Sequence, residues 1–276
     1  MRRCRRRSVL NTCTALATTP RRHSISWQSG VDSSHPAQDP VSQHEWGTAP
    51  DFVGPRHELR ERLLLDLLVA ADPGRSILNI GAGQGSFTRL LERRGYEVVS
   101  SDVAPAAVAV LESRVRGEVV RADMTDLPYP DRVFDAVVAG EVIEHIADDH
   151  RALSEAARVL RPDGVLALSV PAHPAWFGAS DRWAGHVRRY TQATLTQAFD
   201  GAGFILERLR PWGFPMSALY HRAIYDKRAA ALAAEQREHR AALRVLRLAL
   251  QVDRLFVGVE RGCLGYLALA RVPATR

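Results

Sequence analysis

A cluster of three glycines, Gly81, Gly83 and Gly85, lies in the segment NIGAGQGSF, directly after an apolar run and before a helical pattern. Glycines in such a loop let the backbone approach a ligand closely, because they carry no Cβ. The helix that follows offers free backbone N–H groups at its first turn. The spacing therefore predicts a strand, a tight ligand-binding loop and a helix.

Two aspartates end the next two predicted strands. Asp102 closes YEVVSSD, where a carboxylate can accept hydrogen bonds from the vicinal hydroxyls of a ribose. Asp123 closes GEVVRAD and can accept a hydrogen bond from an exocyclic amine, while Met124 beside it offers a polarizable face to an adenine ring. The simpler interpretation makes Asp102 a helix cap and Asp123 the start of a turn. Together with the glycines, the two acids indicate a nucleoside site.

Strand and helix patterns alternate around these residues. An amphipathic helix is predicted within residues 58–72, since its leucines recur on one stripe before Pro73 and Gly74. Apolar strand patterns then end near residues 80, 102, 123, 141 and 170, with helical segments between most of them. This alternation predicts an α/β fold with a doubly wound, mostly parallel sheet. Ligands of such sheets bind at the carboxyl ends of the strands, which is where the glycines and aspartates stand.

The segments NIGAGQG, SSD, RADMTDLPYPDRVFDAVVAGEVIEHI and LRPDGVLALSVP resemble the class I S-adenosylmethionine-dependent methyltransferases. The resemblance covers residues 77–170, is weaker to about residue 210 and is absent before residue 55. It implies a Rossmann-like, seven-stranded sheet whose last strand, Gly265 to Val272, is antiparallel, and it implies S-adenosyl-L-methionine as cofactor.

The resemblance also implies roles for single residues. The glycine loop would hold the methionine part of the cofactor, Asp102 the ribose, and Glu141 would lie near the methionine end. Val103 would flank the adenine. The family usually has Asp or Glu where this chain has Asn79. The full implied cofactor set is Asn79, Gly81, Ala82, Gly83, Gly85, Asp102, Val103, Asp123, Met124 and Glu141.

A nicotinamide-dependent oxidoreductase is the main alternative, because the dinucleotide pattern G-x-G-x-x-G also opens a helix after a strand. Its third glycine would fall at position 86, where this chain has Ser86. A hydride-transfer enzyme also has no need of an acidic residue at the end of the third strand, where this chain has Asp123. A second alternative is a catalytically silent protein that binds the cofactor without turnover, and Asn79 favours that interpretation.

His145 is the candidate general base, since it follows the fourth strand in EVIEH and imidazole titrates near neutral pH. Methyl transfer from a sulfonium is a direct displacement that depends chiefly on alignment and exclusion of water. A hydroxyl acceptor still gains from a base. The plain alternative is a histidine that hydrogen-bonds a loop.

Two insertions are expected to form the acceptor side. Residues 171–190 supply aromatic and polar side chains for a small molecule, with Trp176, His186 and Tyr190 as candidate substrate contacts. The histidines of this insertion and Asp181 present no recognisable metal spacing, so no metal site is expected.

Residues 211–256 are predicted to form a helical lid with an amphipathic helix. The outward face would carry Arg237, Arg240, Arg244, Arg247 and Arg254, and the face over the acceptor Ala242, Val245, Ala249, Val252 and Phe256. The arginine face would be solvated, meet a phosphorylated substrate, or make a peripheral contact with a membrane.

The net charge of +6 comes from the first residues of the 276-residue chain. Residues 1–31 hold seven arginines and no acid, and without them 30 basic residues face 31 acidic ones. The folded part therefore offers no basic surface for nucleic acid. Residues 1–50 are interpreted as a disordered Arg/Ser-rich tail, either a targeting signal or a wrongly assigned start, and residues 51–276 as the methyltransferase domain.

Composition completes the hypothesis. Three cysteines without paired spacing suggest neither a disulfide framework nor a zinc site, and they fit a reducing cytoplasm. No apolar stretch is long enough to span a membrane. The sequence therefore predicts a cytoplasmic enzyme of small-molecule biosynthesis that transfers a methyl group, with oxygen favoured as the acceptor. No feature indicates a particular oligomeric state.

Overall fold

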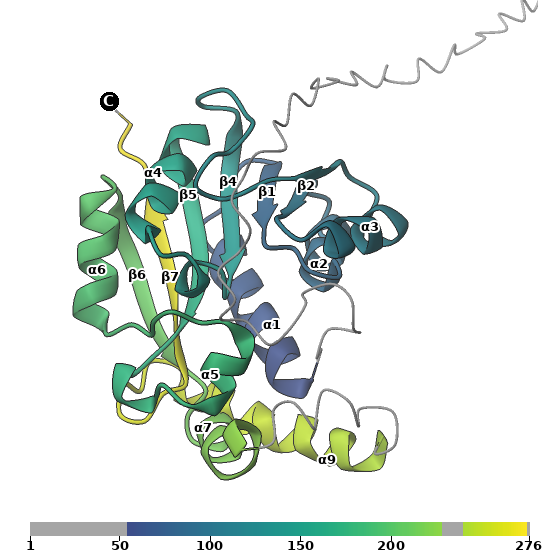
Figure 1. Cartoon of the computed structure of the whole chain (residues 1–276), viewed down its shortest axis with the longest axis vertical. Helices are drawn as coiled ribbons and strands as arrows, with labels where there is room; N and C mark the ends of the chain where they lie inside the picture. The colour runs from purple at the N-terminus through teal and green to yellow at the C-terminus, as the bar shows by residue number, and fades with distance from the viewer. Residues whose placement is uncertain (1–53, 228–239, 275–276) are drawn as a thin grey trace, which may run out of the picture. The chain divides into compact units, whose positions relative to one another are not determined.

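The computed structural model describes residues 54–227 and 240–274, which all belong to one compact unit (Figure 1). The predicted tail at residues 1–50 lies outside the described residues and stays a prediction. No helix in residues 54–227 or 240–274 is long and apolar enough to cross a membrane.

Seven strands form one sheet in the order β3-β2-β1-β4-β5-β7-β6. Neighbours from β3 to β5 are parallel, and β7 runs antiparallel to both β5 and β6. The predicted seven-stranded sheet with an antiparallel last strand is confirmed. The strands are β1 (Ser76–Ile80), β2 (Glu97–Asp102), β3 (Val119–Arg121), β4 (Phe134–Gly140), β5 (Leu160–Pro171), β6 (Ile205–Trp212) and β7 (Gly265–Arg271).

Helices connect these strands and cover the sheet (Figure 1). The first part of the chain has α1 (Pro55–Val69), α2 (Ser86–Arg93), α3 (Pro105–Arg114), the 3₁₀ turn η1 (Ile143–His145) and α4 (Asp149–Val159). After β5 come η2 (Pro174–Trp176), α5 (Ala179–Ala184) and α6 (Gln192–Gly201). Between β6 and β7 lie α7 (Met216–Tyr220), the π-helical turn η3 (His221–Tyr225), α9 (Arg240–Leu250) and η4 (Gln251–Phe256).

The core has two halves because successive strand residues point to opposite faces of the sheet. Leu78 and Val137 belong to the half that packs with α4 and α6. Ile77 and Ala136 belong to the other half, with α1 and α2. The leucine stripe predicted for the first helix is buried in that second half: Leu59, Leu63, Leu64, Leu67 and Leu68. The near-continuous apolar strands are those of a parallel sheet covered on both faces.

The amphipathic helix of the second insertion is present, but its faces differ from the prediction. Val245 is 68% exposed and Val252 41%, so these members of the expected inward stripe face solvent. Arg247 instead reaches Glu58 of α1 at 2.6 Å, and Arg254 reaches the same helix. Leu246 and Leu250 pack on the core instead, because the helix lies along α1. The side chains of Arg237, Arg240 and Ala242 lie outside the described residues.

Candidate active site

The glycine loop after β1 has the left-handed backbone that its glycines allow. Gly81, Gly83 and Gly85 have φ of 63°, 53° and 80°. A Cβ on Gly81 would stand 2.5 Å from the Val142 side chain, which is closer than two carbons can approach. The loop therefore needs glycine for both conformation and space. α2 begins directly after it, with no side-chain cap at its N-terminus.

Asp102 at the end of β2 fixes this loop. Its Oδ2 accepts a hydrogen bond from the Gly83 amide at 2.9 Å, and its Oδ1 accepts one from the Ala104 amide at 3.0 Å. Burial raises the pKa of the carboxyl above its ordinary value, although the backbone amides oppose that shift. Val103 beside it is 42% exposed, so an apolar side chain faces solvent where the adenine was predicted.

Asp123 lies two residues beyond β3, which ends earlier than the sequence suggested. Its Oδ1 accepts hydrogen bonds from the amide and the hydroxyl of Thr125, both at 2.8 Å. This is the turn-starting geometry of the plain interpretation. Met124 is buried with 3% exposure. The structure does not test whether Asp123 and Met124 also contact an adenine.

Asn79 is part of a buried polar chain under the loop. Its Nδ2 donates to Thr88 Oγ1 at 2.9 Å, and Thr88 Oγ1 lies 2.8 Å from Ser100 Oγ. All three residues are buried. This series of hydrogen-bonded side chains links β1, α2 and β2, so the amide of Asn79 stabilises the packing beneath the glycine loop.

Glu141 follows β4 with a left-handed φ of 61°. Its Oε2 lies 3.5 Å from Arg60 Nη1 of α1. Burial, the largest single cause, would raise the pKa of Glu141, but the charges of Arg60 and His186 and the hydroxyl of Ser169 together lower that pKa below its ordinary value. Sequence reasoning missed Arg60, although the polar pairs Arg56/Arg60 and His57/Glu61 recur at helical spacing beside the leucine stripe.

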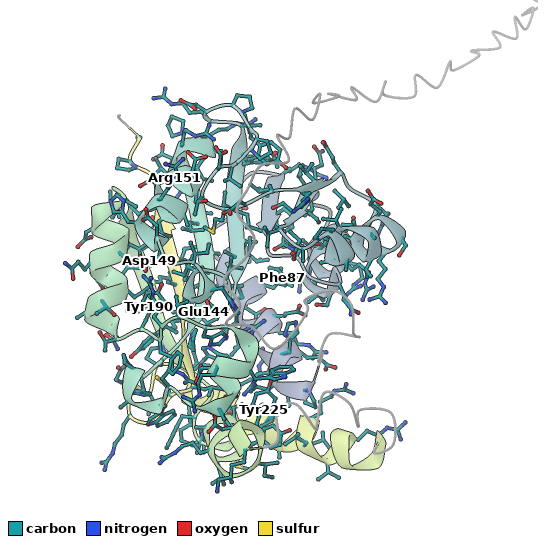
Figure 2. All side chains as sticks on the ribbon, in the orientation of Figure 1. Phe87, Glu144, Asp149, Arg151, Tyr190 and Tyr225 are labelled. Carbon is teal, nitrogen blue, oxygen red and sulfur yellow. The ribbon has the colours of Figure 1, made fainter. Side chains whose placement is uncertain are left out.

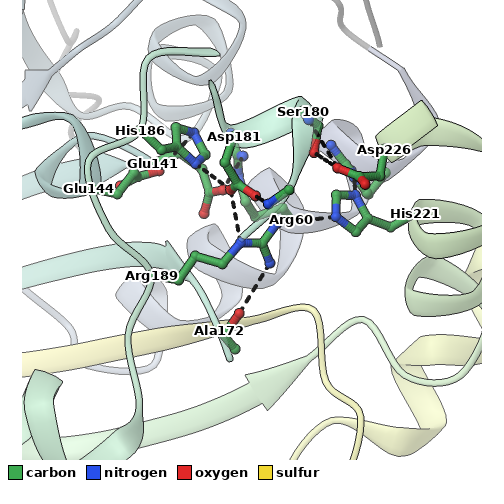
Figure 3. A network of polar contacts seen from close by, with 12 residues as sticks. Arg60, Glu141, Glu144, Ala172, Ser180, Asp181, His186, Arg189, His221 and Asp226 are labelled. Carbon is green, nitrogen blue, oxygen red and sulfur yellow. Dashed lines mark hydrogen bonds and ion pairs between the residues drawn. The ribbon is translucent and has the colours of Figure 1, made fainter. Parts of the chain in front are cut away.

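A second polar group gathers next to Glu141 (Figure 3). Glu144 is fully buried, and its two carboxylate oxygens have no hydrogen-bond partner within the described part of the chain. Burial and the nearby charge of Glu141 raise its pKa well above the ordinary value. His186 Nε2 lies 3.9 Å from Glu144 Oε1. The His145 ring stands edge-on to the His186 ring, with centroids 4.6 Å apart.

His145 lies where the sequence placed it, at the end of η1 directly after β4. Burial and the neighbouring His186 lower the pKa of its imidazole to about 4. A hydrogen bond with the backbone of Gly185 holds the ring. The imidazole is therefore neutral at pH 7, and a neutral imidazole can accept a proton or bind a metal ion.

Asp181 is the centre of a buried network that sequence reasoning did not predict (Figure 3). Its Oδ1 lies 2.8 Å from His186 Nδ1 and accepts a hydrogen bond from Arg189 Nε at 2.8 Å. Burial opposes its ionisation, yet these partners lower its pKa well below the usual range. Arg189 Nη2 lies 3.2 Å from His221 Nε2, and Arg56 Nη1 lies 2.9 Å from His221 Nδ1. The network thus joins α1, the first insertion and the second.

The other two predicted acceptor contacts, Tyr190 and Trp176, have different partners. Tyr190 is 2% exposed, and its hydroxyl donates to Asp149 Oδ2 at 2.7 Å (Figure 2). Trp176 lines a cavity of about 270 Å³ together with Phe177 and His221. The guanidinium carbon of Arg222 lies 4.9 Å from the centroid of the Trp176 ring. Of the predicted acceptor-side residues, the structure brings together His145 and His186.

A glycine loop after the first strand, an acid at the end of the second and a sheet with one antiparallel strand define a Rossmann-like domain of the nucleoside-binding type. Residues 78–168 match the methyltransferase domain family. This match assigns residues 78–168 to a methyltransferase domain, and the chain is similar to S-adenosylmethionine-dependent methyltransferases.

The sequence relatives agree with this assignment. A protein of Mycolicibacterium smegmatis named a probable S-adenosylmethionine-dependent methyltransferase is 32% identical over 151 residues, which are 54% of this chain and 59% of that protein. A demethylmenaquinone methyltransferase of Thermus thermophilus is 36% identical over 142 residues, 44% of this chain and 64% of that protein. The chain thus spans less than two thirds of the length of these relatives.

Solved structures share the fold. Phosphoethanolamine N-methyltransferase 2 of Haemonchus contortus, in complex with S-adenosyl-L-methionine, has a TM-score of 0.54 at 19% identity and covers 77% of this chain and 52% of its own. The [4+2]-cyclase SpnF has a TM-score of 0.57 at 22% identity, with 85% of this chain and 88% of its own covered. One fold therefore carries proteins named for different reactions.

Proposed function

We propose that this chain transfers a methyl group from S-adenosyl-L-methionine to a small-molecule acceptor, with an oxygen atom as the favoured acceptor. The observation that carries the proposal is the contact of Asp102 with the Gly83 amide, because it holds a carboxylate beside a loop that only glycine can form. The demethylmenaquinone methyltransferases among the relatives support a small-molecule acceptor.

The residues at the ends of β1 and β2 fit the cofactor. A Cβ at Gly81 would collide with the Val142 side chain, so glycine is required for the conformation that the loop would present to the cofactor. Asp102 would take the ribose, and the exposed Val103 would lie against the adenine. Asp123 and Met124 remain the proposed adenine contacts, and Glu141 the contact near the methionine end. The bound cofactor supplies an electrophilic methyl group on a sulfonium.

The other side chains would align the acceptor and remove its proton. The neutral His145 imidazole is the proposed base, and a positioned base typically contributes about 10²- to 10⁴-fold to the rate. His186 and Trp176 are the proposed acceptor contacts. Tyr190 would contribute its ring to the wall, since its hydroxyl already bonds Asp149.

We also propose a cytoplasmic enzyme of small-molecule biosynthesis that needs no nucleic acid. The balance of 30 basic against 31 acidic residues beyond residue 31 supports the last point. A peripheral membrane contact would involve the exposed face of α9 with Val245 and Leu248.

Calorimetry with S-adenosylmethionine and with a nicotinamide dinucleotide tests the cofactor. We expect micromolar binding of S-adenosylmethionine alone, and preferential binding of the dinucleotide would overturn the proposal. Methyl transfer needs a separate assay, because the [4+2]-cyclase SpnF has the same fold. Incubation with labelled S-adenosylmethionine and a panel of hydroxylated small molecules should give labelled product. Binding without labelled product from any acceptor would favour the silent protein instead.

A further inference from the structure

Three side chains at the carboxyl end of β4 form a group with the chemistry of a metal site. We propose that Glu144, His145 and His186 bind a divalent first-row transition-metal ion. One ligand atom from each residue lies within 4.8 Å of the others. They come from two segments, the turn η1 and the loop after α5, and this is why the sequence spacing predicted no metal site.

The carboxylate needs a partner. Glu144 is 0% exposed, and neither of its oxygens has a hydrogen-bond partner in residues 54–227 and 240–274. Burying a carboxylate without a partner is unfavourable in free energy, because the group loses its hydrogen bonds to water and forms none with the protein. The imidazole nitrogen His186 Nε2 lies 3.9 Å from Glu144 Oε1, which is beyond hydrogen-bond distance. A metal ion between these two atoms would satisfy both.

The histidines are held in the orientation that ligands require. Asp181 Oδ1 lies 2.8 Å from His186 Nδ1, and with the proton on this nitrogen the lone pair of Nε2 in the neutral ring faces Glu144. The backbone of Gly185 holds the ring of His145. A carboxylate or carbonyl behind a ligating histidine is the usual outer shell of metal sites, because it fixes the tautomer and the direction of the lone pair.

The distances suit an ion after a small contraction. Bonds of about 2.1 Å at tetrahedral or octahedral angles place ligand atoms roughly 3.0 to 3.5 Å apart. The 3.9 Å between His186 Nε2 and Glu144 Oε1 exceeds that by less than about 1 Å. η1 is a short turn after a strand and His186 lies outside a regular helix, so side-chain rotation can close the gap.

The donor set selects the class of ion. Two imidazoles and one carboxylate suit Mn²⁺, Fe²⁺ or Zn²⁺, whereas Mg²⁺ and Ca²⁺ prefer oxygen ligands throughout. Three protein ligands leave open positions for an oxygen of another molecule. If the proposed function holds, that oxygen belongs to the acceptor hydroxyl. The ion would lower the pKa of this hydroxyl, and its proton would be released to solvent. His145 would then be a ligand, and the role of base would fall away.

Metal binding is measured directly on the full chain. After treatment with a chelator, the protein is titrated with Mn²⁺ and free Mn²⁺ is followed by electron paramagnetic resonance, with a Zn²⁺ competition arm. We expect one Mn²⁺ per chain, displaced by Zn²⁺. Glu144→Gln and His186→Ala should each weaken Mn²⁺ binding by tenfold or more, and Asp181→Asn by about 10- to 100-fold through loss of the outer shell. Imidazole nitrogen coupling to bound Mn²⁺ should disappear stepwise in His186→Ala and His145→Ala.

Matched controls are the exposed Glu112→Gln on α3 and the exposed His150→Ala on α4, which should bind Mn²⁺ like the unaltered chain. Circular dichroism shows which variants fold, and Glu144→Gln keeps the shape of the side chain in case His186→Ala does not. Binding weaker than about 1 mM, or binding that Glu144→Gln and His186→Ala both leave unchanged, would overturn the site. Calorimetry with S-adenosylmethionine on the metal-free protein separates this failure from failure of the proposed function.

Discussion

The buried acidic side chains at the two ends of the candidate site have different kinds of partner. At the ends of β1 and β2, a side chain meets backbone: Asp102 accepts from the amides of Gly83 and Ala104. At the ends of β4 and β5, side chains meet one another, as Arg189 meets Asp181 and Arg60 meets Glu141. The backbone partners of Asp102 are provided by the loops that follow β1 and β2, whereas the charged partner of Glu141 comes from a separate element, α1. The first end therefore depends on local backbone contacts, and the second depends on side chains from several elements.

The largest expected effect is on turnover and tests whether the two ends act separately. His145→Ala should lower kcat by about 10²-fold or more at neutral pH, because it removes either the base or a metal ligand. Affinity for S-adenosylmethionine should hold, since His145 is not among the proposed cofactor contacts and the ribose and adenine are assigned to the other end. Steady-state rates and calorimetry measure the two quantities. A loss of turnover below about threefold would reduce His145 to a structural role.

The cofactor end is tested by Asp102→Ala. The change removes a carboxylate assigned to two ribose hydrogen bonds and also frees the amides of Gly83 and Ala104. At about 1.5 to 3 kcal/mol for a hydrogen bond to a charged group, affinity for S-adenosylmethionine should fall at least tenfold. The exposed Asp200→Ala on α6 is the control for calorimetry. Unchanged affinity in Asp102→Ala would mean that the ribose lies elsewhere.

A third variant asks whether the second insertion is anchored independently of the cofactor. Asp253 is fully buried and accepts hydrogen bonds from the amides of Met216 at 2.7 Å and Ser217 at 2.8 Å. Asp253→Ala should cost about 2 kcal/mol of unfolding free energy and lower the thermal midpoint by roughly 4 to 8 °C. Cofactor affinity measured well below the midpoint should not change. A parallel loss of affinity would show that the two ends of the site are coupled.

The smallest effect concerns a partly exposed ion pair within α4, Glu155 and Arg158. The hydrogen bond from Arg158 Nε at 2.8 Å lowers the pKa of Glu155 below 4.5. A depressed carboxyl pKa stabilises the fold above the pKa of the unfolded chain, and that contribution is lost as the pH falls through the folded pKa. Glu155→Gln should therefore lose about 0.5 kcal/mol at pH 7 and less below pH 4.5. Denaturant titrations at both pH values give the difference, and equal losses would refute the assignment.

The same contrast explains what the sequence could reveal. The loop at Gly81 and the acid at Asp102 depend on local patterns, a strand followed by glycines and a strand followed by an acid, and both stand where they were predicted. The meeting of His145 with His186 depends on how the first insertion folds over η1, and no short pattern records that. The same holds for Arg60 of α1 beside Glu141. The faces of α9 were wrong because the amphipathic pattern does not say which neighbour the helix packs against.

The position of β7 has a consequence for synthesis of the chain. β7 lies between β5 and β6, with Leu267 paired to Ser169 and Gly265 paired to Trp212. The edge of β5 is therefore unpaired until β7 has been synthesised, about a hundred residues later. At ordinary elongation rates this interval is roughly 5 to 20 s. During that interval the nascent sheet has an open edge able to pair with another chain. Chaperones that bind extended apolar segments should therefore contact the nascent chain at β5, and their contact should end once β7 has emerged.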